Sequence, residues 1–334
     1  MRELLRPIVV APMAGGPSTP GLVIAAGHAG ALGFLAAGYK PPEAVEAEVQ
    51  EVRKADVPYG VNLFVPSSPP ADVAPLERYR AALQPEADRY GIDLPPLRLS
   101  DDDHFAAKVD LAVSHRIPLV SFTFGIPPAA VVTALRSAGC AVLITVTSGA
   151  EARQAVAAGP DALIAQGGSA GGHASTFSPA TYTGTRATRD VLAEVLAVAR
   201  TAADIPVIAA GGGDVAALLA AGAAAVQCGT AFVLSDEAGT RPAQRAAMLS
   251  GDHRETVVTR AFTGQPARAL RNRFVDTYSS IAPIGYPAIH HLTAPIRAAA
   301  ARRGDASALN LWAGVNHASA RPAPVAAVID ALRG

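Results

Sequence analysis

Short apolar runs alternate with longer alanine-rich or amphipathic stretches over the first 234 residues of the chain. Several runs, such as Ile8–Val10 and Val142–Val146, are apolar at successive positions, which is typical of strands buried on both faces. Each run is followed by a stretch with helical composition, so the pattern predicts repeated βα units. The eight expected strands are residues 8–10, 31–35, 59–64, 119–124, 142–146, 162–165, 206–209 and 225–228. Eight such units favour an α/β fold of the (β/α)8 TIM barrel type over a doubly wound sheet.

The alternation is interrupted at two places. Residues 65–100 are rich in proline and predict an insertion that carries one helix near 74–83. After Leu234 the βα pattern stops, and residues 235–303 predict a second, smaller, mostly helical domain over the barrel mouth. We therefore expect a barrel over residues 1–234, a substrate-covering domain over 235–303 and a C-terminal return to the barrel over 304–334.

Charge and composition exclude several classes of partner. The chain has 334 residues with 28 basic and 28 acidic side chains, so it carries no net charge. No basic stripe indicates a nucleic-acid partner, and no polybasic segment indicates a membrane surface. The N-terminus lacks the apolar core of a signal peptide, and apolar runs are shorter than a membrane span. We expect a cytoplasmic monomer or homodimer with reduced cysteines at Cys140 and Cys228.

A glycine-rich segment directly follows the sixth expected strand. Residues 166–173 read Gln-Gly-Gly-Ser-Ala-Gly-Gly-His, and the four glycines allow a sharp turn and a close approach to a ligand. Its last residue, His173, is the side chain type best suited to move protons near neutral pH. Since a TIM barrel keeps its chemistry at the carboxyl ends of the strands, His173 is the candidate catalytic residue. The alternative interpretation is a water-exposed loop histidine.

Two further glycine-rich loops follow the last two expected strands. Gly211–Gly213 and Gly229–Thr230 offer backbone N–H groups and a hydroxyl at the place where many barrels bind phosphate. The alternative is that these glycines only close tight turns. No Gly-x-Gly-x-x-Gly with a downstream acid occurs in a dinucleotide context, so the sequence does not predict a Rossmann NAD site.

The carboxamide of Asn62 lies in the third expected strand, and that of Gln166 ends the sixth. Side chains with both donors and acceptors suit a planar heterocycle such as an isoalloxazine, although either could simply cap the barrel. Met13 belongs either to the core or to the face of such a ring. A metal site is not expected, because His290 and His291 are adjacent and no His-Glu-x-x-His pattern occurs.

Six segments together resemble one known family. They are residues 11–16, 61–64, 121–127, 166–173, 209–213 and 226–232, in order along nearly the whole chain. These segments are similar to those of the nitronate monooxygenases, formerly called 2-nitropropane dioxygenases. The resemblance implies an FMN-containing TIM barrel with a helical second domain and His173 as catalytic base. The cofactor-binding positions that it implies are Ala11, Pro12, Met13, Asn62, Gln166, Gly171, Gly172, Gly211, Gly212, Gln227, Cys228, Gly229 and Thr230.

The chain departs from the family pattern at several positions. Ser169 stands in place of an acid, Ser175 in place of a glycine, and Thr123 where many members have a histidine. Tyr286 lies where some members place substrate-binding tyrosines, whereas His290 does not continue that pattern. The candidate substrate-binding residues are Ser121, Thr123, Tyr286 and His290.

The function expected from the resemblance is the oxidation of alkyl nitronates, or of nitroalkanes, with O2 to a carbonyl compound and nitrite. His173 would deprotonate a neutral nitroalkane or, when protonated, hold the charge of the nitronate. Two alternatives stay open at this point. One is an NAD(P)H-dependent FMN reductase of the enoyl-acyl-carrier-protein or quinone type, and the other is a flavin-binding protein without turnover. Substrate specificity is expected to reside in residues 65–97 and in the segment after Leu234.

Overall fold

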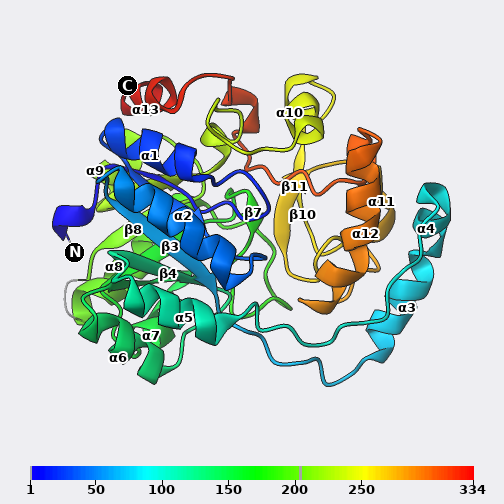
Figure 1. The fold of residues 1–334 in the computed structure, drawn as a ribbon, viewed down its shortest axis with the longest axis horizontal. Helices are drawn as coiled ribbons and strands as arrows, with labels where there is room; N and C mark the ends of the chain where they lie inside the picture. The colour runs from blue at the N-terminus through cyan, green and yellow to red at the C-terminus, as the bar shows by residue number, and fades with distance from the viewer. Residues whose placement is uncertain (1, 203–204) are drawn as a thin grey trace.

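A closed barrel of parallel strands forms one half of the molecule. The computed structural model of the chain describes residues 2–202 and 205–334, and Figure 1 shows its ribbon. The strands follow one another around the barrel, with β1 hydrogen-bonded to both β2 and β9. They are β1 (Ile8–Val10), β2 (Leu32–Ala36), β3 (Tyr59–Phe64), β4 (Leu119–Thr123), β5 (Ala141–Val146), β6 (Ala162–Gln166), β8 (Val207–Ala210) and β9 (Ala225–Cys228). The expected (β/α)8 barrel is confirmed, with all eight strands at the expected places.

The barrel strands are apolar on both faces because both faces are buried. Val9, Leu143 and Ile164 belong to a cluster that draws residues from seven of the eight strands and fills the barrel interior. β3 contributes Gly60 instead, where a Cβ atom would lie 2.2 Å from the Phe34 ring. The Phe34 side chain therefore occupies the space that a side chain of β3 would fill.

Helices surround the barrel on its outside. Their apolar faces pack against the strands in two further core clusters. The C-terminal helix α13 packs against α1 and α9, which brings the end of the chain back to the barrel wall (Figure 1). These helices are α1 (Pro20–His28), α2 (Pro42–Lys54), α5 (Phe105–Ser114), α6 (Ala129–Ser137), α7 (Gly149–Val156), α8 (Thr188–Ala202), α9 (Val215–Ala220) and α13 (Val325–Arg333). None of the helices in the described part of the chain is long and apolar enough to cross a membrane.

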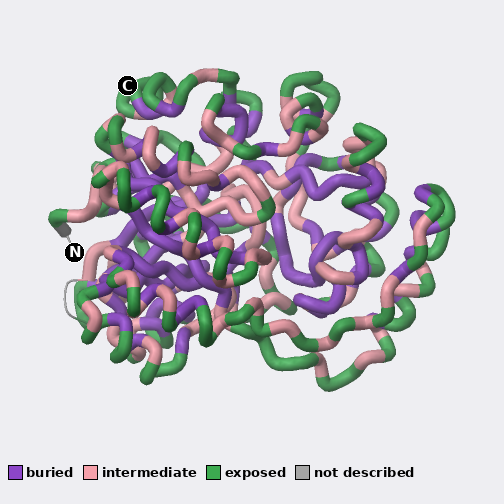
Figure 2. Tube along the Cα trace, viewed as in Figure 1, coloured by how far each residue is buried: buried purple, intermediate pink, exposed green. Residues whose placement is uncertain are grey.

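A separate core cluster lies beside the barrel and draws on two distant parts of the sequence. We call residues 66–104 and 235–313, which supply this cluster, the cover. Figure 2 shows its buried segments on the side opposite the chain termini, reached by a mainly exposed stretch around residues 66–72 and a partly buried one around residues 91–100. The helices of the cover are α3 (Ala74–Ala82), α4 (Gln84–Tyr90), α10 (Pro242–Leu249), α11 (Arg273–Tyr278) and α12 (Ala288–Arg302).

Two expectations for the cover are wrong in part. Residues 235–303 are not simply helical, because β10 (Thr256–Thr259) and β11 (Ala267–Leu270) form an antiparallel pair. β-Branched residues in β10 favour a strand, and the pair is extended by β7 (Gly172–His173), which comes from the barrel. The insertion carries α3 and α4 instead of one helix, and both pack on α12. Its apolar residues are buried because the distant α12 covers them.

Short 3-10 turns complete the chain. They are η1 (Arg2–Leu4), η2 (Thr230–Phe232), η3 (Ala306–Ala308) and η4 (His317–Ser319).

Candidate active site

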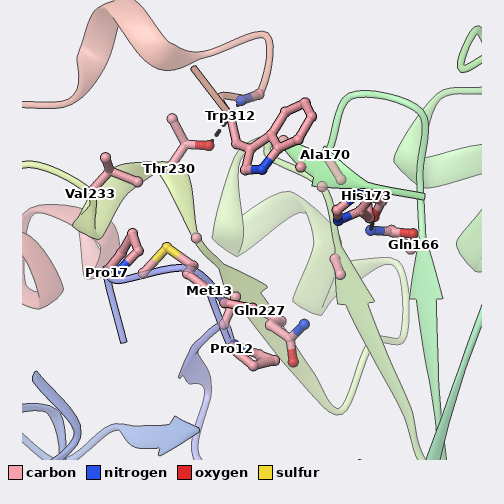
Figure 3. A pocket seen from close by; sticks show the side chains of 18 of the residues that line it. Pro12, Met13, Pro17, Gln166, Ala170, His173, Gln227, Thr230, Val233 and Trp312 are labelled. Atoms are coloured by element: carbon pink, nitrogen blue, oxygen red, sulfur yellow. Dashed lines mark hydrogen bonds between the residues drawn. The ribbon is translucent and has the colours of Figure 1, made fainter. Parts of the chain in front are cut away.

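One cavity of about 440 Å³ lies at the carboxyl ends of the barrel strands, where the barrel meets the cover. Loops after β1, β6, β8 and β9 line one side, and side chains of the cover line the other. Figure 3 shows Met13, Gln166, His173, Gln227 and Trp312 around it. Every residue that the sequence nominated for the site lines this cavity, apart from Tyr286.

The Gln166 carboxamide holds the glycine-rich loop in shape. Its Nε2 donates to the carbonyl of His173 at 2.9 Å, and its Oε1 accepts from the amide of Ser175 at 2.7 Å. The loop also packs tightly against the end of the cover, since a Cβ atom at Gly171 would lie 2.6 Å from the carbonyl carbon of Ala313. Gln166 thus uses both ends of its side chain to position the loop that carries His173.

Ser169 joins two of the glycine-rich loops. Its Oγ donates to the carbonyl of Gly211 and lies 2.8 Å from Oγ1 of Thr188, which donates to the same carbonyl at 3.1 Å. A carboxylate at position 169 could not donate to that carbonyl. The serine therefore suits the local hydrogen bonding of this chain.

His173 lies between the barrel and the cover. β7 pairs with β11, which places His173 opposite Ala267. Its ring lies 5.4 Å from the ring of Phe124 and 5.2 Å from that of Trp312, both measured between centroids. Nε2 lies 2.9 Å from Oγ1 of Thr263. These contacts exclude the alternative of a water-exposed loop histidine.

Burial determines the protonation state of His173. Burial, and after it the positive charge of Arg297, lowers the pKa of His173 to about 3. The imidazole is therefore neutral near pH 7, and it can accept a proton. The expected second role, a protonated His173 that holds the charge of a nitronate, is not supported by this environment.

The Asn62 carboxamide is oriented by its neighbours on β4. Nδ2 donates to Oγ of Ser121 and to Oγ1 of Thr123, both at 3.0 Å. Ser121 is completely buried. Two of the residues nominated for substrate binding thus fix the Asn62 side chain, and the threonine that replaces the family's histidine takes part.

The loops after β8 and β9 leave backbone and polar atoms facing the cavity. Gly211, Gly212 and Gly213 have φ values of +129°, +70° and +133°, a region that favours glycine. A Cβ atom at Gly212 would have only the Asn316 side chain near it, at 3.7 Å, and would project into the open cavity. Within the described residues, the buried Oε1 of Gln227 has no hydrogen-bond partner. These groups form a cradle for a bound ligand.

Thr230 adds a hydroxyl donor to this cradle. Its Oγ1 accepts a hydrogen bond from the amide of Gly314 at 2.9 Å (Figure 3). The hydroxyl proton therefore stays available for an anion in the cavity.

The remaining nominated side chains lie at the cover side of the cavity. The ring of His290 stacks on that of Tyr39, with 4.2 Å between centroids. The Tyr286 ring does not line the cavity, but it lies 6.1 Å from the ring of His173 and 5.0 Å from that of Phe124. Tyr286 thus belongs to the layer of rings directly behind the cavity wall.

Sequence reasoning missed the two cations of the cavity. Arg241 and Arg297 line it, and within the described part of the chain no aspartate or glutamate does. One sequence feature could have pointed to Arg297: it lies seven residues after His290, two turns along the same helix face. Arg241 precedes α10 and has no comparable periodic relation to a nominated residue. Trp312, the single tryptophan, was also missed.

The chain is similar to known proteins over nearly its whole length. The family model described as nitronate monooxygenase matches residues 1–333. A probable nitronate monooxygenase of Staphylococcus saprophyticus is 37% identical over 331 residues, covering 94% of this chain and 91% of the relative. A solved structure of nitroalkane oxidase from Streptomyces ansochromogenes is 42% identical with a TM-score of 0.93, covering 99% of this chain and 96% of that one. FabK from Thermotoga maritima is 27% identical with a TM-score of 0.72, covering 99% and 93%.

Proposed function

Because the chain belongs to the nitronate monooxygenase family, we propose that it oxidises alkyl nitronates, and nitroalkanes after deprotonation, with O2 to a carbonyl compound and nitrite. One observation carries this proposal: the glycine loops, the carboxamides of the barrel strands and a neutral histidine converge on a single cavity. The nitroalkane oxidase that the fold matches at a TM-score of 0.93 acts on the same class of compound.

The residues present fit FMN as the cofactor. Gly211 to Gly213 and Thr230 would hold the phosphate, because they offer an open cradle and a free hydroxyl proton. Asn62 and the unpartnered Oε1 of Gln227 would face the polar edge of the ring. When bound, FMN supplies the acceptor for electrons that leave the nitronate. FMN is proposed over FAD because the sequence carries one phosphate cradle and no dinucleotide fingerprint.

His173 would act on the substrate before electron transfer. A neutral nitroalkane must lose a proton from the carbon next to its nitro group, and the neutral imidazole can accept that proton. Thr263 orients the ring through Nε2. The same hydroxyl lies 3.3 Å from the carbonyl of Gln265, to which it donates. Nε2 then carries the histidine's proton, and Nδ1 is the nitrogen that can act as the base.

A second candidate function is an NAD(P)H-dependent FMN reductase, which the likeness to FabK favours. The two functions differ in the electron donor that reduces the flavin. We expect an anaerobic solution of the purified yellow protein to bleach on addition of a nitronate and to stay oxidised with NADH or NADPH. Bleaching by the nicotinamide alone would favour the reductase. A flavin that neither donor reduces would support a binding protein without turnover.

A further inference from the structure

The charge inside the cavity is unbalanced. Two arginines line it, and in the part of the chain that the structure describes no carboxylate does. Buried charges in proteins are normally paired, because an unpaired charge loses the solvation of water. Arg297 forms no salt bridge with any described residue, and burial lowers the pKa of its guanidinium to about 10. At neutral pH the guanidinium stays charged, so it is available to bind an anion in the cavity.

The Arg297 guanidinium is fixed in position by its own helix. Nε donates to Oγ1 of Thr293 at 3.2 Å, and Nη2 donates to the carbonyl of His290 at 2.8 Å. Thr293 is itself held, since its hydroxyl donates to the carbonyl of Phe262 at 2.6 Å. Among the described residues Nη1 has no hydrogen-bond partner. The donors of Nη1 are therefore preorganised and unused.

Arg297 is close enough to His173 to affect its charge. The positive charge of Arg297 contributes to the low pKa of His173, and Nη2 of Arg297 lies 3.5 Å from Nδ1 of His290. The positive charge of Arg297 would repel a protonated His173. The two side chains therefore differ in role: Arg297 is a permanent cation, and His173 is a neutral proton acceptor.

We propose that Arg297 binds the oxygens of the nitronate anion, which carry the negative charge of the substrate, through its free guanidinium donors. This proposal rests on the proposed function. The planar guanidinium matches two oxygens on one nitrogen, as it matches a carboxylate. When the base removes the α-proton of a neutral nitroalkane, the C–H electron pair moves into the C=N bond and the charge develops on the nitro oxygens. The proton stays on His173, and Arg297 stabilises the charge where it forms.

Nitrate is a suitable probe because it is a planar, singly charged anion that the flavin cannot oxidise. The holoenzyme would be titrated with nitrate while the flavin absorbance spectrum is recorded. We expect Arg297→Met to weaken nitrate binding about 10- to 100-fold, the usual worth of hydrogen bonds to a charged group. Arg297→Lys keeps the charge and should recover part of the affinity. The KM for a preformed nitronate should rise in parallel with the nitrate Kd.

Arg260→Met is the matched control. Arg260 is a half-buried arginine of the cover whose Nε donates to the carbonyl of Ala282, and it does not line the cavity. Its replacement should leave the nitrate Kd unchanged. Thermal melting of each holoenzyme shows whether it is folded, and Arg297→Lys serves as the test if the methionine variant does not fold.

Several results would overturn the assignment. They are a wild-type holoenzyme that does not bind nitrate, a folded Arg297→Met protein with wild-type nitrate affinity, or an equal loss in Arg260→Met. The proposed function can fail separately. If wild-type protein binds nitrate through Arg297 but no nitronate reduces its flavin, the anion site stands and the reaction does not.

Discussion

The barrel and the cover contribute different chemistry to the same cavity. The barrel supplies mainly backbone and neutral polar groups: the glycine loops, Asn62, Gln166 and Gln227. The cover supplies both cations, Arg241 and Arg297, together with the Thr263 hydroxyl that contacts His173. The barrel therefore has the features of a cofactor holder, and the cover those of a region that selects and activates the substrate. His173 belongs to both, because its strand starts in a barrel loop and pairs with β11.

This division has a physical basis in how each region is built. The parallel ladder of the barrel is continuous, so each loop leaves it at a defined place and needs glycine to come close to a ligand. The cover surrounds its core with helices and one small sheet, and it reaches the cavity with long side chains. Replacing a side chain of the cover changes the charge of the pocket without disturbing the barrel.

The largest effect is expected from a side chain placed in the phosphate cradle. Gly212→Glu would project into the open cavity and bring a negative charge against a phosphate, so flavin binding should be abolished. The measurement is the flavin content of purified protein. Gly91→Glu is the control, because Gly91 has a similar φ of +65° on the outer end of α4 with open space around it. If the purified Gly212→Glu protein still contains flavin, the phosphate does not bind at this loop.

The next largest effect is expected from replacing His173, which lies between the barrel and the cover. His173→Asn should slow neutral nitroalkanes by about 10²- to 10⁴-fold, the range for a positioned general base. Preformed nitronates should be affected less, since they have already lost the α-proton. Steady-state rates with both forms of one compound make the test, with exposed His28→Asn as the control. Equal losses with both forms would mean that His173 only orients the ligand or the flavin.

The pH profile makes this prediction sharper. The base is the neutral imidazole, so the rate with a neutral nitroalkane rises with pH as His173 loses its proton. Because burial lowers the pKa of His173 to about 3, the rate should rise at a pH well below that at which an ordinary histidine loses its proton. Wild-type kcat should therefore show no histidine limb between about pH 5 and pH 8. A limb near the usual histidine pKa that disappears in His173→Asn would show that the bound cavity is more polar than this structure indicates.

A smaller effect is expected from the contact that joins the cover to the glycine-rich loop. Arg268 of β11 donates to the carbonyls of Gly168 at 2.7 Å and Gly184 at 2.8 Å. Arg268→Met leaves both carbonyls without that donor and should lower the free energy of unfolding by about 1–3 kcal/mol. Denaturant unfolding and flavin affinity would both be measured, beside exposed Arg254→Met. Unchanged stability and flavin affinity would show that the cover does not hold the loop.

The smallest effects are expected from two rings on the cover side, His290 in the cavity wall and Tyr286 directly behind it. Tyr286→Phe and His290→Ala should change KM values by about two- to tenfold, the worth of a neutral hydrogen bond, and leave flavin content unchanged. The measurement is KM across nitronates of increasing chain length, with exposed His104→Ala for comparison. If every constant stays the same in both variants, substrate specificity does not reside in these two rings.

Much of the barrel could be read from the sequence because its determinants are local. A strand buried on both faces must be apolar at successive positions, and a loop that approaches a phosphate must be glycine-rich. Both features are visible in short windows, such as Ile8–Val10 and Gly211–Gly213. The order of βα units then determines which loops share the barrel mouth, so most of the nominated residues line one cavity.

The cover was decided only in the tertiary structure, because its elements depend on partners far away in the chain. β10 and β11 are short, and β11 is completed by β7 from a loop about a hundred residues earlier. α3 and α4 bury their apolar residues against α12, across roughly two hundred residues of sequence.

The charge inside the cavity also depends on residues that are far apart in the sequence. The sequence shows 28 basic and 28 acidic side chains in balance, and only the fold brings two arginines to a cavity that no carboxylate of the described residues lines. Burial, which no local pattern of residues specifies, makes His173 neutral and leaves Arg297 as a cation with no salt bridge to any residue that the structure describes.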